Sequence, residues 1–305
     1  MSVMSEKVFA EALEKDRAGF NAILESLLPT TEDGPFTTLR GAMRYALLGG
    51  GKRVRGLILL QVGKIFELPE SERLPYAAAL EMIHAASLVH DDLPALDNDD
   101  LRRGQASCHK AFDEGQAILA GDALLNMAME LLIAECRKGE LASAASAYMA
   151  GAAGQKGMLG GQSLDLLSVG KEPESISLEE LTALQTLKTG KLLQAAYVCP
   201  ALRAGAEANI VHDLQDLAAN SGLCFQIRDD LLDEEAGTAE LGKTAGKDRR
   251  DGKITFVTVF GRKAAEQRLA ELDKANVKIL ASLEEKGLQL DWLYGMQRWL
   301  SSRRN

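Results

Sequence analysis

The sequence is poor in the residues that build cross-linked scaffolds and nucleic-acid-binding surfaces. Among its 305 residues there are seven prolines, 5% aromatic residues and four cysteines without a CxxC pair. The cysteine spacing argues against a zinc site or a disulfide framework and is typical of reduced thiols. Basic residues number 35 against 44 acidic ones, for a net charge of −9. This balance argues against a nucleic-acid-binding protein, which would show a basic stripe.

The chain also lacks a recognisable targeting segment. Its first twenty residues carry charges throughout and have no apolar core, unlike a signal peptide. No apolar run is as long as a membrane span in this reading of the sequence. We therefore expect a cytoplasmic protein without membrane insertion.

What the sequence does contain favours an all-α fold. Alanine, leucine, glutamate and lysine are abundant, and runs of β-branched residues are few. Ser177 and Glu180 have the spacing of a helix capping box. No composition break divides the chain, so we expect residues 1–305 to form a single domain. Helical periodicity predicts helices over residues 4–28, 39–48, 52–66, 74–92, 106–136, 141–167, from 177 onward, 206–235 and 254–300.

Two clusters of aspartates follow apolar helical segments. Five carboxylates lie within residues 91–100, and a second cluster comprises Asp229, Asp230 and Asp233. Most acidic runs are solvated loops, but carboxylates this crowded repel one another unless cations share the space. Asp229 and Asp233 are one helical turn apart. In the first cluster we expect the helix to end near Pro94, so that Asp97 folds back towards Asp91. The two clusters thus predict two walls of one metal-filled cavity, and magnesium suits such oxygen ligands.

Basic and polar residues with useful spacing accompany these acids. His84 lies two helical turns before Asp91, with Ser87 between them on the same face. By itself, His84 would more often be a core histidine, and its register with Asp91 puts the functional interpretation on an equal footing. The basic residues after Gly51 would by themselves be an ordinary charged helix start. Arginine forks and a helix start after glycines can also bind phosphate oxygens. The phosphate-binding candidates are Lys52, Arg55, Arg102, Arg103, Lys188, Lys243 and Lys253.

Residues 237–244, GTAELGKT, fit the letters of a nucleotide-binding P-loop. A true P-loop joins a buried β-strand to a helix. Here the preceding segment is a charged predicted helix, and the following one is polar and broken by glycines. The context therefore disfavours an NTPase, and residues 237–253 are predicted instead to be a mobile lid.

The motifs taken together resemble the trans-isoprenyl diphosphate synthases, most closely the bacterial farnesyl diphosphate synthase type. The resemblance spans nearly the whole chain and includes the letters of the P-loop pattern. It rests on GGKRVR at 50–55, HDDLPALD at 90–97, RRG at 102–104, AGDA at 120–123, GGQ at 160–162, KTG at 188–190, FQIRDDLLD at 225–233 and LGKTAGKD at 241–248.

The resemblance implies an all-α, barrel-like bundle of helices around a deep central cavity, and a homodimer. It implies an isoprenoid diphosphate substrate and three magnesium ions, which manganese can replace. The ions would be held by Asp91, Asp97 and Asp229 with their neighbours Asp92, Asp230 and Asp233. Arg102, Lys188 and Lys243 would neutralise the charge of the allylic diphosphate. The side-chain oxygens of Thr189 and Gln226 would lie beside the allylic cation and stabilise it. Isopentenyl diphosphate would be held by Gly51, Lys52, Arg55, His84 and Arg103, with Lys253 as a further substrate-binding residue.

Departures from the family pattern concern the helix start and the product length. Gly56 stands where the family commonly has proline, which would loosen the helix start, and Arg228 replaces glutamine or lysine. Ala86, one residue before Ser87, stands where farnesyl-making relatives carry a bulky aromatic floor. A C15 product is expected from the overall likeness, and a C20 product is the alternative. A terpene cyclase and a non-catalytic partner subunit are further alternatives, and both are disfavoured by the intact motifs.

Overall fold

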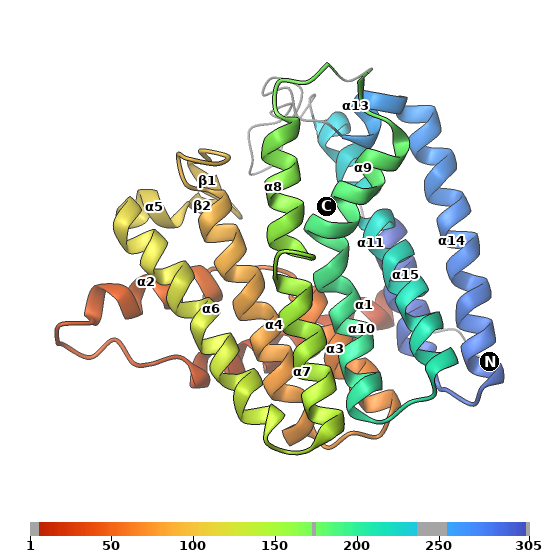
Figure 1. The fold of residues 1–305 in the computed structure, drawn as a ribbon, viewed down its shortest axis with the longest axis horizontal. Coiled ribbons are helices and arrows are strands. Elements are labelled where there is room, and N and C mark those ends of the chain that lie inside the picture. The colour runs from red at the N-terminus through yellow and green to blue at the C-terminus, as the bar shows by residue number, and fades with distance from the viewer. Residues whose placement is uncertain (1–5, 173–174, 237–254, 303–305) are drawn as a thin grey trace.

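The computed structural model describes residues 6–172, 175–236 and 255–302, and the expected all-α fold is confirmed (Figure 1). Within those residues, the sheet is a single two-stranded hairpin, β1 (Leu101–Arg102) with β2 (Gln105–Ala106). The helices are α1 (Glu6–Leu27), α2 (Thr37–Leu48), α3 (Val54–Ile65), α4 (Glu70–Asp91), α5 (Cys108–Ala111), α6 (Glu114–Cys136), α7 (Glu140–Ala153), α8 (Met158–Ser168), α9 (Leu178–Gln185), a π-helix (Thr186–Gly190), α10 (Lys191–Arg203), α11 (Ala208–Ala236), α13 (Phe256–Phe260), α14 (Arg262–Glu285) and α15 (Asp291–Ser302).

Three of the predicted helices are split. The prediction for residues 254–300 is wrong because α13, α14 and α15 are separate helices there, and Gly261 and Gly287, with φ of +82° and +92°, interrupt the helical backbone. The prediction for residues 106–136 is wrong at its start, because Asp113 caps a new helix by accepting a hydrogen bond from the Gln116 backbone. The prediction for residues 141–167 is wrong at its middle. A Cβ at Gly157 would lie 2.0 Å from the Ala152 carbonyl oxygen, so the backbone approaches itself too closely there for other residues. The capping box of Ser177 and Glu180 at the start of α9 is confirmed.

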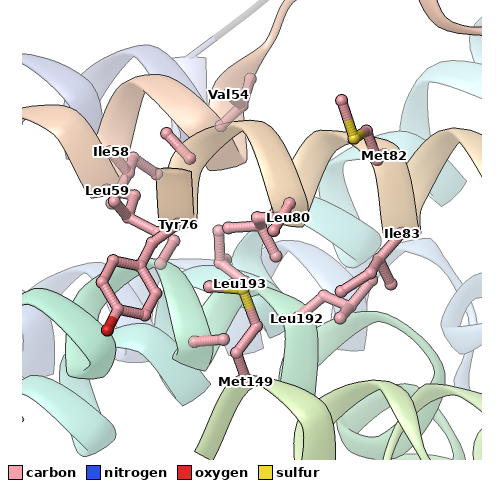
Figure 2. Close-up of a cluster of buried hydrophobic side chains, with 14 of the residues drawn as sticks. Val54, Ile58, Leu59, Tyr76, Leu80, Met82, Ile83, Met149, Leu192 and Leu193 are labelled. Atoms are coloured by element: carbon pink, nitrogen blue, oxygen red, sulfur yellow. The ribbon is translucent and has the colours of Figure 1, made fainter. Parts of the chain in front are cut away.

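The core surrounds α4 and α10. Helix α4 packs chiefly on α6 and α3, and α10 packs on α7, α11 and α3. Tyr76 and Leu80 of α4 lie between the α3 side chains and the α10 leucines Leu192 and Leu193 (Figure 2). The buried Tyr76 hydroxyl donates to the Ala142 carbonyl oxygen at 3.0 Å. This packing fixes the direction in which the C-terminal end of α4 projects.

Helix α6 departs from the expectation that no segment is long and apolar enough to span a membrane. By length and composition, α6 among the described residues passes that test, although length and composition alone are weak evidence. One face of α6 packs on α4 and α2 (Figure 1). The rest leaves Ile118, Leu119 and Ile133 exposed.

Candidate active site

The first aspartate cluster lies where α4 gives way to a folded loop. Helix α4 ends at Asp91, and the Asp97 backbone N–H donates to the Asp91 carbonyl oxygen at 2.9 Å. The Asn98 N–H reaches the Leu93 carbonyl oxygen in the same turn. The expected fold-back around Pro94 is therefore confirmed. It leaves Asp91 and Asp97 half-buried near one another.

Asp92 forms a buried ion pair with Arg102. Its carboxylate is 2% exposed and accepts hydrogen bonds from Arg102 Nε at 2.9 and 3.1 Å and from Arg102 Nη2. Burial disfavours the charged guanidinium, but these bonds outweigh it and raise the pKa of Arg102. Asp92 and Arg102 thus form a hydrogen-bonded ion pair. The roles of Asp92 as a metal ligand and of Arg102 as a phosphate-binding residue stay predictions.

The second cluster lies within the continuous helix α11. Asp229 and Asp233 are half-buried, whereas Asp230 is 5% exposed. Asp230 accepts from Gln226 Nε2 at 3.0 Å and from the Phe256 backbone N–H at 2.9 Å. Asp230 therefore ties α11 to the first turn of α13. The role of Asp230 as a metal ligand stays a prediction.

The π-helix brings Lys188 and Thr189 to this region. The Thr189 hydroxyl donates to Gln226 Oε1 at 3.4 Å, and Lys188 Nζ pairs with Asp165 of α8. A Cβ at Gly161 would lie 2.1 Å from the Lys188 backbone nitrogen, so glycine there permits the close approach of α8. π-helical turns are frequent at functional sites. Asp165 was missed by the sequence analysis, although it lies one helical turn after Gly161.

The basic candidates gather around the loop before α3. Arg103 Nη1 donates to the Gly50 carbonyl oxygen. Gly51 has φ +114°, and a Cβ there would lie 2.6 Å from Arg103 Cζ, so both backbone and space require glycine. Arg55 Nη1 lies 3.3 Å from His84 Nε2. The structure thus brings Gly51, Arg55, His84 and Arg103 together, with Lys52 exposed beside them.

His84 is held neutral by its surroundings. Burial lowers its pKa well below the usual value, and the charges of Arg55, Arg103, Arg53 and Arg102 lower it further. Burial likewise lowers the pKa of Arg103 to about 10, and Arg53 adds to the effect. Arg103 remains charged at neutral pH. Several guanidinium groups around a neutral imidazole make a site suited to a polyanion.

A buried ion pair supports this basic group. Arg53 and Glu81 are 3% and 2% exposed, and their closest charged atoms are 3.4 Å apart. Glu81 Oε1 also accepts from the Gly56 backbone N–H at 3.0 Å. A Cβ at Gly56 would lie 2.3 Å from the Phe20 ring. The helix start is therefore held tightly, which corrects the expectation that Gly56 loosens it.

The acidic side fits a divalent cation. Burial raises the pKa of Asp91 to about 6; Lys188 opposes the shift and Asp97 adds to it. No group of three or more histidine, cysteine, aspartate or glutamate residues lies close enough to form a complete metal site in the described part of the chain. Magnesium typically takes few carboxylates and completes its shell with water and substrate phosphates. Half-buried carboxylates are suitable oxygen donors for such an ion.

The acidic and the basic side of the site lie next to each other. The charge of Asp229 acts to raise the pKa of Arg55, although burial, the larger effect, lowers it. Ala86 is 3% exposed within the core. Ser87, on the face of His84, donates from its hydroxyl to the His84 carbonyl oxygen at 2.9 Å. Lys243 and Lys253, together with the predicted lid at 237–253, lie outside the described residues.

Comparison with known proteins agrees with this arrangement. Residues 36–286 match the polyprenyl synthetase family. The chain is 40% identical over 265 residues to the farnesyl diphosphate synthase of Geobacillus stearothermophilus, covering 86% of this chain and 88% of the relative. It is 39% identical to geranylgeranyl pyrophosphate synthase 4 of Arabidopsis thaliana, with 86% and 73% covered. The crystal structure of a geranyltransferase from Legionella pneumophila superposes with a TM-score of 0.84 at 33% identity, over 98% of this chain and 99% of that one.

The fold and the site thus define an enzyme with the isoprenoid synthase fold. The chain belongs to the polyprenyl synthetase family and is a short-chain prenyltransferase. The resemblance stated from the sequence motifs is confirmed.

Proposed function

We propose that the enzyme condenses isopentenyl diphosphate with dimethylallyl and geranyl diphosphates to give farnesyl diphosphate. The observation that carries this proposal is the contact between two sites of opposite character. Half-buried carboxylates around Asp91 and Asp229 adjoin a guanidinium-rich group around neutral His84. A condensing prenyltransferase needs two diphosphate sites, one of which must also stabilise a departing diphosphate.

The acidic side holds the allylic substrate. Asp91, Asp97, Asp229 and Asp233 would hold magnesium ions, which as Lewis acids stabilise the departing diphosphate. Lys188 exchanges its Asp165 partner for a diphosphate oxygen. The side-chain oxygens of Thr189 and Gln226 stabilise the allylic cation. Asp230 sets the Gln226 amide so that its oxygen, not its nitrogen, meets Thr189.

The basic side holds isopentenyl diphosphate through Lys52, Arg55 and Arg103, with neutral His84 between the arginines. The double bond attacks the cation and forms the new carbon–carbon bond. The released diphosphate then takes the proton, which restores a double bond. Exclusion of water from this space protects the cation from capture.

The test is a product assay on the purified chain with radiolabelled isopentenyl diphosphate, an allylic diphosphate and magnesium. A C15 diphosphate supports the proposal. Release of diphosphate without isopentenyl diphosphate would show a cyclase-type reaction instead. No product from the chain alone would show that it needs a second subunit.

A C20 product is the second candidate, favoured by the small side chain of Ala86 in α4. Similar proteins include both farnesyl and geranylgeranyl synthases. If residue 86 lies under the growing chain, Ala86→Tyr shifts the product towards C10 or C15, while Ala86→Ser leaves the length unchanged. An identical product from Ala86→Tyr would remove residue 86 from length control.

We also propose that the enzyme is a cytoplasmic homodimer of single-domain subunits. The support is three exposed apolar side chains on α6, Ile118, Leu119 and Ile133, which a second copy would cover. Sedimentation equilibrium measures the mass directly, and a value near the 32.9 kDa of one chain would exclude the dimer.

A further inference from the structure

An aromatic residue of the last helix lies against the basic loop. The Lys52 ammonium is 5.3 Å from the centre of the Trp299 ring, within the range of a cation–π contact. The two residues are 247 positions apart, so the fold alone brings them together. We propose that Trp299 is a positioning residue for isopentenyl diphosphate, which acts by holding the Lys52 ammonium at its place in the site. This inference rests on the proposed role of Lys52.

The backbone of Lys52 is already fixed from both sides. Gly51 before it has φ +114°, and Arg53 after it has the left-handed φ of 52°. Arg53 is buried and bonded to Glu81, so this turn is anchored in the core. The Lys52 side chain, by contrast, is exposed. A lysine stem has four flexible bonds, and ordering it upon binding costs entropy.

The indole reduces that cost, because a contact made before substrate arrives restricts the ammonium in advance. A π face attracts the ammonium through its positive charge and occupies none of its N–H donors. Trp299 thus preorganises Lys52 without competing with the substrate for its hydrogen bonds.

The position of Trp299 is fixed by the contacts of its neighbours on α15. Two residues before it, buried Gln297 accepts from the Ser221 hydroxyl at 2.8 Å and donates to Asp273 Oδ1 at 3.0 Å. Ser221 lies on α11, about two turns before Asp229. Leu300, next to Trp299, is fully buried. The position of the indole is therefore tied to the helix that carries the second aspartate cluster.

The experiment compares Trp299→Leu with Trp299→Phe in steady-state kinetics with each substrate varied. Leucine keeps apolar bulk but removes the π face. The expected result is a KM for isopentenyl diphosphate raised about two- to fivefold, the equivalent of one exposed cation–π contact. The KM for the allylic diphosphate and kcat stay within about twofold. Phenylalanine, which keeps a π face, restores much of the loss.

Trp292 provides a matched control on the same helix. Its ring packs against Phe9 of α1, with ring centres 5.6 Å apart. Trp292→Leu lowers the melting temperature and leaves the KM for isopentenyl diphosphate unchanged. If both tryptophan variants raised this KM equally, loss of helix packing would explain the effect and the inference would be wrong.

A double-mutant cycle with Lys52→Ala decides whether Trp299 acts through Lys52. The expected result is that Trp299→Leu has no further effect once Lys52 is alanine. An undiminished effect in that background overturns the inference. If Lys52→Ala alone leaves the KM for isopentenyl diphosphate unchanged, the proposed role of Lys52 fails, which is a separate and recognisable result.

Discussion

The two aspartate clusters bring carboxylates together with different backbone structures. The first spans the end of α4, and its outer acids Asp91 and Asp97 meet because the chain folds back on itself. The second lies within α11, where Asp229 and Asp233 share a face through helical spacing alone. Spacing of four residues needs only a helix, whereas spacing of six needs a built loop.

Both clusters nevertheless use one buried acid as an anchor. Asp92 is bound by the Arg102 guanidinium, and Asp230 by the Gln226 amide and a backbone N–H. The bonds differ in kind, because those to Asp92 come from a charged guanidinium and those to Asp230 come from a side-chain amide and a backbone N–H. Crowded aspartates in one motif therefore divide into ligand candidates and anchors, and removing each kind has different consequences.

The largest effect is expected from the outer acids. Asp91→Ala and Asp229→Ala each lower kcat by about 10³-fold or more, equivalent to about 4 kcal/mol of barrier, because the departing diphosphate loses its metal. The melting temperature stays near that of the wild type, since neither acid is fully buried. Measurement combines single-turnover kinetics with thermal unfolding.

The control is Asp100→Ala in the same acidic run. Asp100 is exposed and pairs with Lys110 on the surface, so its removal changes kcat by less than about twofold. A nearly wild-type rate from Asp91→Ala or Asp229→Ala would refute the assignment of the outer acids.

Substitution of the two anchors, Asp92 and Asp230, is expected to lower the stability of the fold by different amounts. Asp92→Asn leaves the Arg102 charge with the more distant Asp99 carboxylate, at 3.5 Å, and destabilises the fold by about 3 kcal/mol. Asp230→Asn costs about 1 kcal/mol, because neutral donors lose a better acceptor. Its effect on kcat is larger than this loss suggests, since the Gln226 amide can turn its nitrogen towards Thr189. Urea unfolding and kcat measure the two effects, and equal stability losses would contradict the distinction.

The sequence predicted what depends on local spacing. Helical periodicity located most helices, the register placed His84 and Asp91 on one face of α4, and Pro94 predicted the fold-back. The ends of α5, α6, α7 and α8 were missed because they depend on a cap at Asp113 and a close contact at Gly157.

The division of labour among the acids could not be predicted, because it depends on contacts through space. No spacing rule assigns Arg102 to Asp92, or joins Phe256 to Asp230 across 26 positions. The Arg53–Glu81 pair and the Trp299 contact are likewise products of the assembled fold. The sequence motifs therefore located the site, and the tertiary contacts identified which of their aspartates are anchors.

The smallest expected effect is a pH dependence of the first cluster in the metal-free enzyme. Burial raises the pKa of Asp91 from 3.8 to about 6, so the folded state prefers the protonated acid. The stability that this proton contributes is fully present below pH 3.8 and is lost as the pH rises through 6. Between about pH 5 and 7.5, the free energy of unfolding contributed by Asp91 falls by about 1 kcal/mol.

Asp91→Asn, which imitates the neutral acid, isolates this term when both proteins unfold in urea with EDTA present. Because other titrating groups are shared, their contributions cancel in the difference. The variant gains stability over the wild type as the pH rises through this range. Saturating magnesium reverses the order, since the ion favours the ionised carboxylate that the variant lacks. A difference that does not change with pH would show that Asp91 is already charged in the metal-free fold, and that the first cluster needs no cation to compensate it.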